Sequence, residues 1–437
     1  MTFSSNGGPG NGGEGRLAKA DLARPLVLVL GADMGAGHRK VGCELARRLA
    51  RHGVATKSVE IDALLPPGWG RGLTGLYKFM ACRAQWLYEA TFSLQMRSRP
   101  GSTPVLFPLD VLAERRLARL VSRERPALIV STFHLSSQVA GRMRQAGTLG
   151  VPVATFVLDF YVHGMWVHGG VDAHLLLHRS QVVQVEERGG RRPVVCGPVV
   201  GAEFGSRSPG WDREAARRSL GLGDEERCVL VVGGSWGVGD LPATYRAIAA
   251  DGRFFPVAVA GHNRDLESTL RETQRAWPGR RQGKVIGWAD DMDRLMAAAD
   301  VVVENAGGLT AMEAMARGVP VVTYAPIAGH GRANARAMAA AGVSVYPSTP
   351  AELAVSLYEL SAASPRRQRL MVEASSMFSC DAADVIAAWA LSGDVGAPIT
   401  TGRAGGRLAA AQPWPGGTNA GGSPAEAPLT ESQWQAT

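Results

Sequence analysis

The sequence has few cysteines, no long apolar run and no leader-like start, and each absence excludes a class of protein. Its five cysteines are scattered and never spaced as C-x-x-C, which argues against a disulfide framework or a zinc site. No run of about 18 uncharged apolar residues is available to span a bilayer, and the N-terminus lacks the apolar region of a signal peptide. We therefore expect a reducing compartment and a cytoplasmic protein, either free or peripheral at the inner face of the cell membrane.

Aromatic residues make up only 6% of the chain, whereas its 54 glycines and high aliphatic content are typical of an α/β enzyme with many turns. At 437 residues, the chain is too long for one ordinary core, so two domains are expected. The net charge of +8 favours anionic partners, namely nucleotide phosphates, nucleic acid or an anionic membrane face. Solvated helix faces explain dispersed arginines equally well, so the charge alone decides nothing.

Short aliphatic runs alternate with helical patterns, which indicates βαβ units and parallel sheets. A first set of runs lies at 25–31, 127–132, 152–159, 173–178 and 193–197, and a second at 228–234, 255–261, 283–288, 300–307 and 319–325. The fold class is therefore α/β, with two Rossmann-like, doubly wound parallel-sheet domains. We assign 23–200 to the first domain, 201–226 to a Gly- and Pro-containing linker and 227–394 to the second domain. Residues 1–22 and 395–437 are predicted to be disordered tails, because they have little aliphatic content to bury.

A glycine-rich turn, "GADMGAGHRK", follows the first strand and delivers His38 to the start of a helix that should end at Gly53. The turn lacks the lysine and Ser/Thr of a P-loop and the G-x-G-x-x-G spacing of a dinucleotide site, so neither phosphate motif is met. A histidine at a helix N-terminus has a lowered pKa, because the dipole disfavours its protonated form. Neutral His38 is therefore placed to accept a proton, although a helix cap or a packed side chain explains the same position.

Two glycine turns in the second half are candidates for nucleotide binding. "VLVVGGSWGVGD" places Ser235 among backbone amides that can approach a phosphate, although a tight strand-to-helix turn fits equally well. "DVVVENAGGLTAMEAM" is more specific, because the amides around Gly308 and Thr310 can face a pyrophosphate while Glu313 accepts from a ribose diol. Glu313 also completes a T-x-x-E capping box with Thr310, and both roles remain open.

The motifs "GAGH", "LDFYVHGMW" (158–166) and "GWADDMDRLMAAADVVVENAGGLTAMEAMARGVPVVTYAPIAGHGRANARAM" (287–338) together resemble the monogalactosyldiacylglycerol synthase and MurG group, glycosyltransferases of the family 28 type. The resemblance spans roughly residues 25–390. It implies the GT-B fold, in which two Rossmann-like domains face each other across a cleft and the C-terminal one binds the nucleotide sugar.

The resemblance also implies roles for particular residues. His38 matches the general base on the acceptor hydroxyl, with Asp159 as a second catalytic position. The donor UDP-sugar would be bound by Ser235, Trp288, Ala289, Met292, Gly307, Gly308, Leu309, Thr310, Glu313, His330 and Asn334. The acceptor side would comprise Gly35, Gly37, His134, His163 and Trp166. One departure is His330 in "PIAGHGRANA", where relatives carry a glutamine that touches the sugar hydroxyls, so the sugar is left open.

Residues 69–99 carry apolar and aromatic side chains at mostly helical spacing among lysines and arginines. This pattern suits a helix lying on an anionic membrane surface, and it also suits a helix packed within the first domain. In the lipid-modifying relatives this region serves the acceptor, which favours the first interpretation.

The sequence thus predicts an inverting glycosyltransferase that moves a hexosyl group from a UDP-sugar to a hydroxyl, with a diacylglycerol-type lipid as first choice. No D-x-D pair of carboxylates in a sheet-end loop calls for a metal ion, so neither metal nor cofactor is expected. Alternatives are a cell-wall or natural-product acceptor, or a UDP-sugar epimerase or hydrolase on the same fold. A nucleic-acid-binding regulator is disfavoured because the basic residues are dispersed, and a dehydrogenase because both turns miss the fingerprint spacing.

Overall fold

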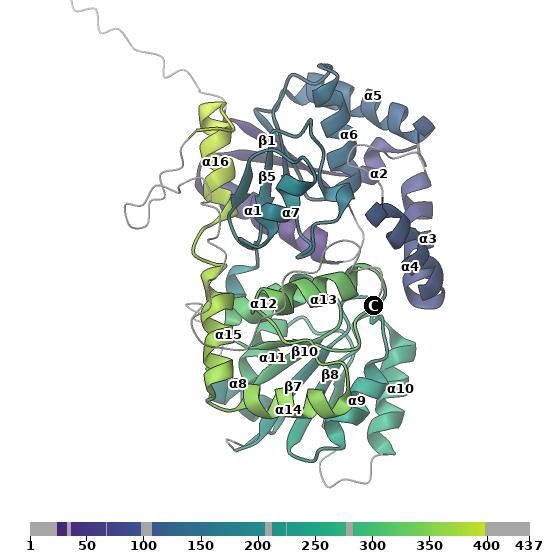
Figure 1. The fold of residues 1–437 in the computed structure, drawn as a ribbon, viewed down its shortest axis with the longest axis vertical. Coiled ribbons are helices and arrows are strands. Elements are labelled where there is room, and N and C mark those ends of the chain that lie inside the picture. Colours follow the sequence, from purple (N-terminus) through teal and green to yellow (C-terminus); the bar gives the residue numbers. More distant parts are fainter. Residues whose placement is uncertain are drawn as a thin grey trace, which may run out of the picture.

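The computed structural model describes residues 24–32, 36–66, 68–97, 107–205, 212–223, 225–276 and 283–397. Two lobes, each built on one parallel sheet, lie one above the other (Figure 1). The predicted tail 1–22 lies outside the described residues, as does the predicted C-terminal tail beyond residue 397.

The sheet of the N-terminal lobe has six parallel strands in the order β2-β1-β3-β4-β5-β6. Their bounds are β1 Leu26–Gly31, β2 Ala55–Glu60, β3 Leu128–Ser131, β4 Val153–Phe156, β5 Ala173–Leu176 and β6 Pro193–Val195. Successive residues of β1 point to opposite faces. Val27 and Val29 pack with α1 and α16, while Leu28 and Leu30 pack with α2, α5 and α6. Both faces are therefore covered, as an all-parallel sheet requires.

The sheet of the C-terminal lobe has five parallel strands in the order β11-β10-β7-β8-β9. Their bounds are β7 Arg227–Val232, β8 Phe254–Val259, β9 Lys284–Ile286, β10 Val301–Glu304 and β11 Val321–Thr323. One face packs with α9, α10 and α14, and the other with α8, α11, α12 and α15. The predicted pair of doubly wound domains is confirmed.

The helices of the N-terminal lobe and of the chain's return to it are α1 Ala36–Arg51, α2 Ile61–Leu64, α3 Trp69–Arg83, α4 Gln85–Arg97, α5 Phe107–Glu124, α6 His134–Gln145, α7 Gln181–Glu187 and α16 Ala382–Ser392. Those of the C-terminal lobe are α8 Arg213–Leu220, α9 Leu241–Ala249, α10 Arg264–Arg275, α11 Met292–Ala298, α12 Leu309–Arg317, α13 His330–Ala340, α14 Pro350–Ser361 and α15 Pro365–Ser376, and short 3₁₀ turns lie at Gly164–Trp166 and Ala202–Phe204. None of the helices in the described part of the chain combines the length and apolar character needed to cross a bilayer.

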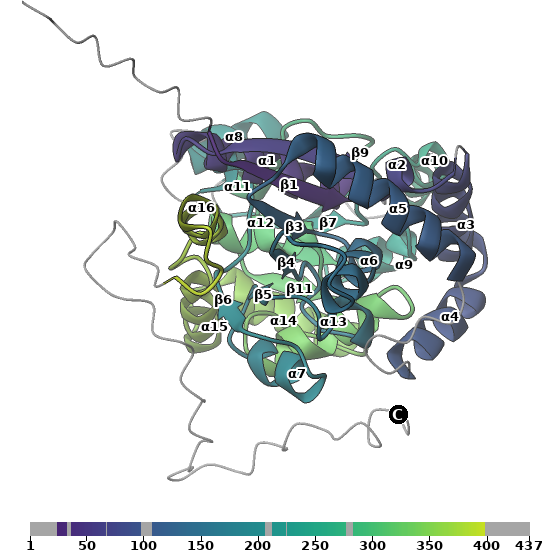
Figure 2. The same cartoon turned by 90° about the horizontal axis from the view of Figure 1, so that it is seen from above.

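The last helix, α16, does not pack on the C-terminal lobe, which the preceding part of the chain forms. Although 227–394 was assigned to the second domain, α16 packs on α1 of the N-terminal lobe, where Arg48 Nη1 donates to Asp381 at 2.9 Å and His52 contacts Asp384 at 3.0 Å. Figures 1 and 2 both place α16 beside the N-terminal sheet, on the flank opposite α3 and α4. Val385, Ile386 and Trp389 are buried there, because this apolar helix is covered by the N-terminal lobe.

The chain therefore crosses between the lobes twice, after β6 and again after α15. The two crossings touch at Gly197, whose φ is +75° and whose added Cβ would lie 1.9 Å from the carbonyl oxygen of Met377. Only glycine fits so close an approach in the left-handed region. Within the predicted linker 201–226, α8 folds onto α11 of the C-terminal lobe.

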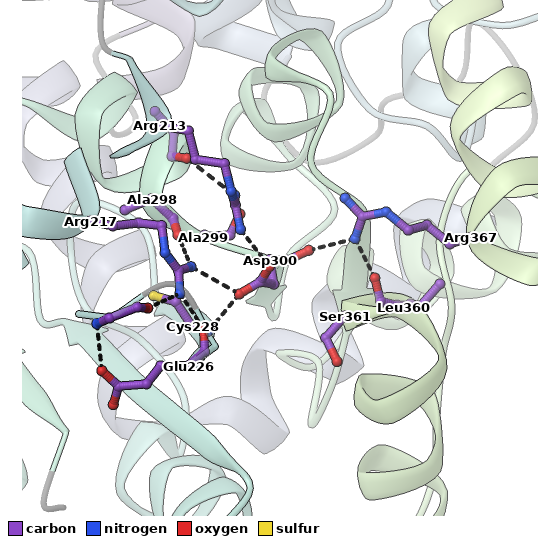
Figure 3. A network of polar contacts seen from close by, with 12 residues as sticks. Arg213, Arg217, Glu226, Cys228, Ala298, Ala299, Asp300, Leu360, Ser361 and Arg367 are labelled. Carbon is purple, nitrogen blue, oxygen red and sulfur yellow. Dashed lines mark hydrogen bonds and ion pairs between the residues drawn. The ribbon is translucent and has the colours of Figure 1, made fainter. Parts of the chain in front are cut away.

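A network of polar contacts lies at the amino ends of strands β7 and β10 in the C-terminal lobe (Figure 3). The loops that line the cavity described below follow the opposite, carboxyl ends of the strands. The carboxylate of Asp300, just before β10, accepts from Arg213 at 2.5 Å, from Arg217 at 3.3 Å and from the backbone N–H of Cys228 at 2.7 Å. Arg367 of α15 donates to the carbonyl oxygen of Asp300 at 2.9 Å. One residue thus ties α8 and α15 to the start of β7 and β10.

Candidate active site

Each sheet reverses its strand order at one point, between β1 and β3 in the N-terminal lobe and between β7 and β10 in the C-terminal lobe. In open α/β sheets, ligands bind outside the carboxyl ends of the strands at such reversals. Here the two reversals face each other across a cavity of about 300 Å³. The loops after β1, β4, β7 and β10 line it, so the candidate site lies between the lobes.

Most of the predicted site residues line this cavity. They are Gly37, His38, Asp159, Ser235, Trp288, Ala289, Met292, Gly308, Leu309, Thr310, Glu313 and His330. Gly307, Asn334, His134, His163 and Trp166, which the sequence also predicts as site residues, are not among the residues that line this cavity. Gly35 lies outside the described residues.

His38 lies in the first turn of α1, at the N-terminal helix position that the sequence predicts. Its Nδ1 lies 3.1 Å from the carbonyl oxygen of Thr132, at the end of β3. A carbonyl only accepts, so Nδ1 carries the proton and Nε2 keeps its lone pair. Burial lowers the pKa of His38, while the charge of Asp159 and the bond to Thr132 oppose this. The lowered pKa of His38 agrees with the sequence prediction, but burial rather than the helix dipole is the main cause.

Asp159 follows β4 and lies at the centre of a polar and aromatic cluster. Its carboxylate accepts from Trp166 Nε1 at 2.9 Å and from Asn334 Nδ2 at 3.2 Å, and His163 Nε2 lies 3.7 Å away. Burial raises the pKa of Asp159, but the bond to His163 and the charge of His330 outweigh it and hold the pKa well below its usual range. Asp159 is therefore an anion at the cavity wall.

His134, His163 and Trp166 form the aromatic support behind Asp159. The ring of His134 meets those of His163 and Trp166 edge-on at 5.4 and 5.7 Å. The three predicted acceptor-side residues thus come together, yet they hold Asp159 rather than line the cavity.

Asn334 of α13 bridges the lobes instead of lining the donor site. Its Oδ1 accepts from the backbone N–H of Tyr161 at 2.8 Å, and its Nδ2 donates to Asp159 and to the carbonyl oxygen of Ala306 at 3.1 Å. Both ends of the amide are used, and the residue is 1% exposed. The amide therefore has no free donor for a sugar in this arrangement.

The turn after β10 is shaped by a buried carboxylate that sequence reasoning missed. Glu304 accepts from the backbone N–H groups of Ala306 at 2.8 Å and Gly307 at 2.6 Å, and from Thr323 Oγ1 at 2.5 Å. Gly307 has a φ of +66°, and an added Cβ would lie 2.6 Å from that of Asn334. This folding aims the free amides at the start of α12 into the cavity, where they suit a diphosphate.

Glu313 is on the second turn of α12, because the helix begins at Leu309 with Gly308 as a cap without a side chain. This geometry excludes the capping box with Thr310. The Glu313 carboxylate, 4% exposed, instead faces the N-terminal lobe, where Lys40 Nζ of α1 lies 3.5 Å away. Burial raises the pKa of Glu313 to about 7 against the charge of Lys40. The predicted ribose ligand is thus held by a cation from the opposite lobe.

Trp288 presents an aromatic surface at the end of the cavity beside β8 and β9. His262 stacks on one face of its ring, with centroids 3.8 Å apart and planes 7° apart, and Trp288 Nε1 donates to Asp290 at 2.7 Å. The ring is still 40% exposed. A flat, fixed and accessible ring is suited to stacking a nucleobase.

Sequence reasoning missed Lys40, His262, Tyr77 and Trp236 as site residues, although all but His262 line the cavity. Lys40 follows His38 by two positions, and His262 directly follows Gly261 in the turn after β8, so their places in or beside glycine turns were a usable signal. Tyr77 meets Trp236 across the lobes with centroids 6.0 Å apart, and no local pattern announces such a contact. No group of three or more acidic, histidine or cysteine side chains in the described ranges is arranged to hold a metal ion.

Two family models match the chain. Residues 39–200 match the model described as monogalactosyldiacylglycerol (MGDG) synthase, and residues 212–376 match glycosyl transferases group 1. The processive diacylglycerol beta-glucosyltransferase of Bacillus pumilus is 26% identical over 51% of this chain and 57% of its own length. That of Bacillus cytotoxicus is 24% identical over 76% of this chain and 84% of its own length.

Solved structures show the same fold. MurG of Acinetobacter baumannii superposes with a TM-score of 0.54 at 17% identity, covering 84% of this chain and 99% of its own. Os79 from O. sativa, solved in complex with UDP, gives 0.57 at 16% identity, covering 84% and 100%. The two facing Rossmann-like lobes and the cavity between them define a GT-B glycosyltransferase. More particularly, the chain is similar to the monogalactosyldiacylglycerol synthase family in its N-terminal lobe and to glycosyl transferases group 1 in its C-terminal lobe, which agrees with the resemblance that its motifs indicated.

Proposed function

We propose that this enzyme transfers a hexosyl group from a UDP-sugar to a hydroxyl of a diacylglycerol-type lipid, with inversion at the anomeric carbon. The single observation that carries the proposal is the position of His38. His38, whose Nε2 keeps its lone pair, lines the same cavity as the first residues of α12, whose backbone N–H groups suit a diphosphate. A base from one lobe and a diphosphate site from the other therefore lie on opposite sides of this cavity. The names of the curated relatives support the lipid acceptor.

In the proposed reaction, His38 Nε2 accepts the proton of the acceptor hydroxyl as its oxygen attacks the anomeric carbon. The bond from that carbon to the β-phosphate oxygen breaks, and its electron pair leaves with UDP. The amides around Gly308 stabilise the negative charge that develops on the diphosphate. Asp159 stabilises the imidazolium of His38 that forms, since its charge already opposes the fall in that residue's pKa. No step calls on a metal.

The α3–α4 hairpin provides a surface for the membrane that holds such an acceptor. Its outward face exposes Trp69, Leu76, Phe79 and Trp86, with exposed fractions from 52% to 75%. Lys78 is an exposed cation of the same helix α3, and its ammonium lies over the ring of Trp236 at the cavity. Aromatic and apolar side chains next to a cation are suited to the interface of an anionic bilayer. The inward face of the same hairpin packs against the site, so only the outward face is proposed as the membrane surface.

The proposal is tested by incubating the purified chain with UDP-glucose or UDP-galactose and diacylglycerol in mixed micelles, and measuring glycolipid and UDP. We expect both products in equal amounts, and His38→Gln should abolish both. UDP released without acceptor would indicate a hydrolase, and a new sugar nucleotide an epimerase. Retention of activity by His38→Gln would overturn the assigned base.

Membrane contact is tested separately by sedimentation with vesicles of phosphatidylcholine alone or with phosphatidylglycerol. We expect binding that rises with the anionic lipid and is lost in the triple variant Trp69→Ser, Phe79→Ser, Trp86→Ser. That variant should retain UDP affinity, because none of the three residues lines the cavity. Equal binding by both proteins would contradict the assigned surface.

A further inference from the structure

The hydroxyl of Tyr88, on the inward face of α4, lies 2.5 Å from Nδ1 of His330 at the start of α13. His330 lines the same cavity as His38 and the start of α12, where the proposed function places the donor sugar. Tyr88 does not line the cavity. A residue of the acceptor lobe is thus hydrogen-bonded to a residue of the donor lobe that faces the expected sugar.

Close packing fixes this contact. An added Cβ on Gly329, which precedes His330, would lie 3.0 Å from the rings of both Tyr88 and Phe92, and its φ is +68°. The rings of Tyr88 and His330 meet edge-on at 5.8 Å. Arg332 Nη1, two residues after His330, donates to Glu89, the residue that follows Tyr88, at 2.5 Å. The α3–α4 hairpin therefore packs on the first turn of α13 through several independent contacts.

The direction of the hydrogen bond follows from the chemistry of its partners. A phenol is a better donor than acceptor, and a neutral imidazole nitrogen is a good acceptor. Burial lowers the pKa of His330 and raises that of Tyr88, so both are neutral at physiological pH. The Tyr88 hydroxyl also lies 3.1 Å from that of Tyr77, which can donate to it in turn. A chain from Tyr77 through Tyr88 to His330 Nδ1 leaves the imidazole proton on Nε2.

We propose that Tyr88 is a positioning residue for donor-sugar selection: it holds His330 as the tautomer whose Nε2–H donates to one hydroxyl oxygen of the hexose. The inference rests on the proposed UDP-sugar transfer. A glutamine offers both donors and an acceptor to sugar hydroxyls, whereas His330 held in this way offers one donor with a fixed direction. Discrimination between hexoses that differ in the orientation of one hydroxyl is then set by a side chain of the acceptor lobe.

The test is Tyr88→Phe, which removes the hydroxyl and keeps the ring that packs on Gly329. Losing one hydrogen bond should raise KM for the preferred UDP-hexose about 3- to 10-fold and reduce the preference between UDP-glucose and UDP-galactose by a similar factor. The dissociation constant of UDP, which has no sugar, should stay within about twofold. The matched control is Tyr245→Phe, which removes a hydroxyl from a fully buried ring on α9 that does not line the cavity.

Two further measurements separate positioning from packing. In ¹⁵N NMR of histidine-labelled protein, His330 should show a protonated Nε2 in the native chain and a mixture of tautomers in Tyr88→Phe. In a His330→Gln background, Tyr88→Phe should no longer change the sugar preference. An unchanged preference in Tyr88→Phe, a protonated Nδ1 on native His330, or equal losses of UDP and UDP-hexose affinity would each overturn the role of Tyr88. Absence of turnover with every UDP-hexose would instead overturn the proposed function, and the NMR signature would still report the tautomer.

Discussion

His38 Nδ1 donates to the carbonyl oxygen of Thr132 at 3.1 Å, so a backbone group of the loop between β3 and α6 fixes the tautomer of His38, which lines the cavity. A backbone carbonyl cannot be protonated or removed by a side-chain change, which makes this a durable way to keep Nε2 free. The hydrogen bond also joins the segments that follow β1 and β3, the two neighbouring strands between which the N-terminal sheet reverses its order.

Replacement of this base should slow chemistry and leave donor binding intact. We expect His38→Gln to lower kcat about 100- to 10,000-fold, the usual contribution of general-base catalysis. The dissociation constant of UDP, measured by calorimetry, should not change. His52→Gln is the matched control, because His52 pairs with Asp384 outside the cavity. A loss of UDP affinity in His38→Gln would indicate a donor-binding role instead.

The pH dependence of kcat, measured with saturating donor so that protonation of Glu313 does not contribute through donor affinity, should show the lowered pKa of His38. The base must be neutral to accept a proton, and burial holds its pKa below 6.5. Activity should therefore persist at pH 6.5 and be lost only as the pH falls further, through the lowered value. Initial rates from pH 4.5 to 8 check this, with the fold monitored by circular dichroism at each pH. An acid limb above pH 6.5 would contradict the assignment.

Removal of the Trp288 ring should weaken nucleotide binding. A nucleobase stacked on an aromatic ring is worth about 1–3 kcal/mol, so Trp288→Ala should weaken UDP binding about tenfold or more. His262→Ala should have a smaller effect, since it removes only the support on which Trp288 stacks. Trp86→Ala serves as the control because Trp86 is exposed on the hairpin. The measurement is UDP titration by calorimetry without lipid, and equal affinity in all variants would refute the base site.

Lys40 should affect donor affinity in a pH-dependent way, although it belongs to the other lobe. Burial raises the pKa of Glu313 to about 7, and the charge of Lys40 opposes that rise. Lys40→Met should raise it further, leaving Glu313 protonated near pH 7 and a poorer acceptor for a ribose diol. UDP affinity should therefore fall at pH 7 and recover towards pH 9, where the carboxyl ionises.

The controls for this experiment are Lys40→Arg, which keeps the charge, and Arg39→Met, which removes a neighbouring exposed charge. Glu203 is the other charged group acting on Glu313, and it raises the pKa in all variants alike. A loss of affinity that is equal at every pH would show that Lys40 contacts the diphosphate directly.

Asp300 should be a strong determinant of stability and not of binding. Asp300→Ala leaves the side chain of Arg217, only 5% exposed, without its carboxylate partner. Breaking a buried ion pair in this way costs about 3–5 kcal/mol. Urea unfolding measures the change, and Asp212→Ala, which removes only the N-cap of the same helix, should cost about 1 kcal/mol. Equal costs for the two variants would contradict the importance of the network.

The sequence predicted ten of the strands because their aliphatic runs are bounded by turn residues, but it missed β2. This strand, "ATKSVE", lies at the edge of the sheet and alternates polar side chains, so it has no apolar run to reveal it. The sequence predicted the glycine turns, and residues of these turns line the cavity, because local spacing encodes a turn. Contacts such as Tyr88 to His330, 242 positions apart, depend on how two lobes meet and have no local signature.

The same limit explains Asn334 and α16. The amide of Asn334 is adjacent to donor residues in sequence, but its partners Asp159 and Tyr161 come from the other lobe. The apolar residues of α16 are buried, and only the three-dimensional course of the chain shows which lobe buries them.

Because α16 packs on the N-terminal lobe, this lobe is formed by two separate stretches of the sequence. A fragment ending near residue 200 would carry α1 with the apolar face that α16 covers left in water, and such a fragment is expected to aggregate. The donor lobe, by contrast, is one uninterrupted stretch. Any recombinant split of this enzyme, or any exchange of donor lobes with a relative, would have to be spliced at both crossings beside Gly197 and Met377, not at one.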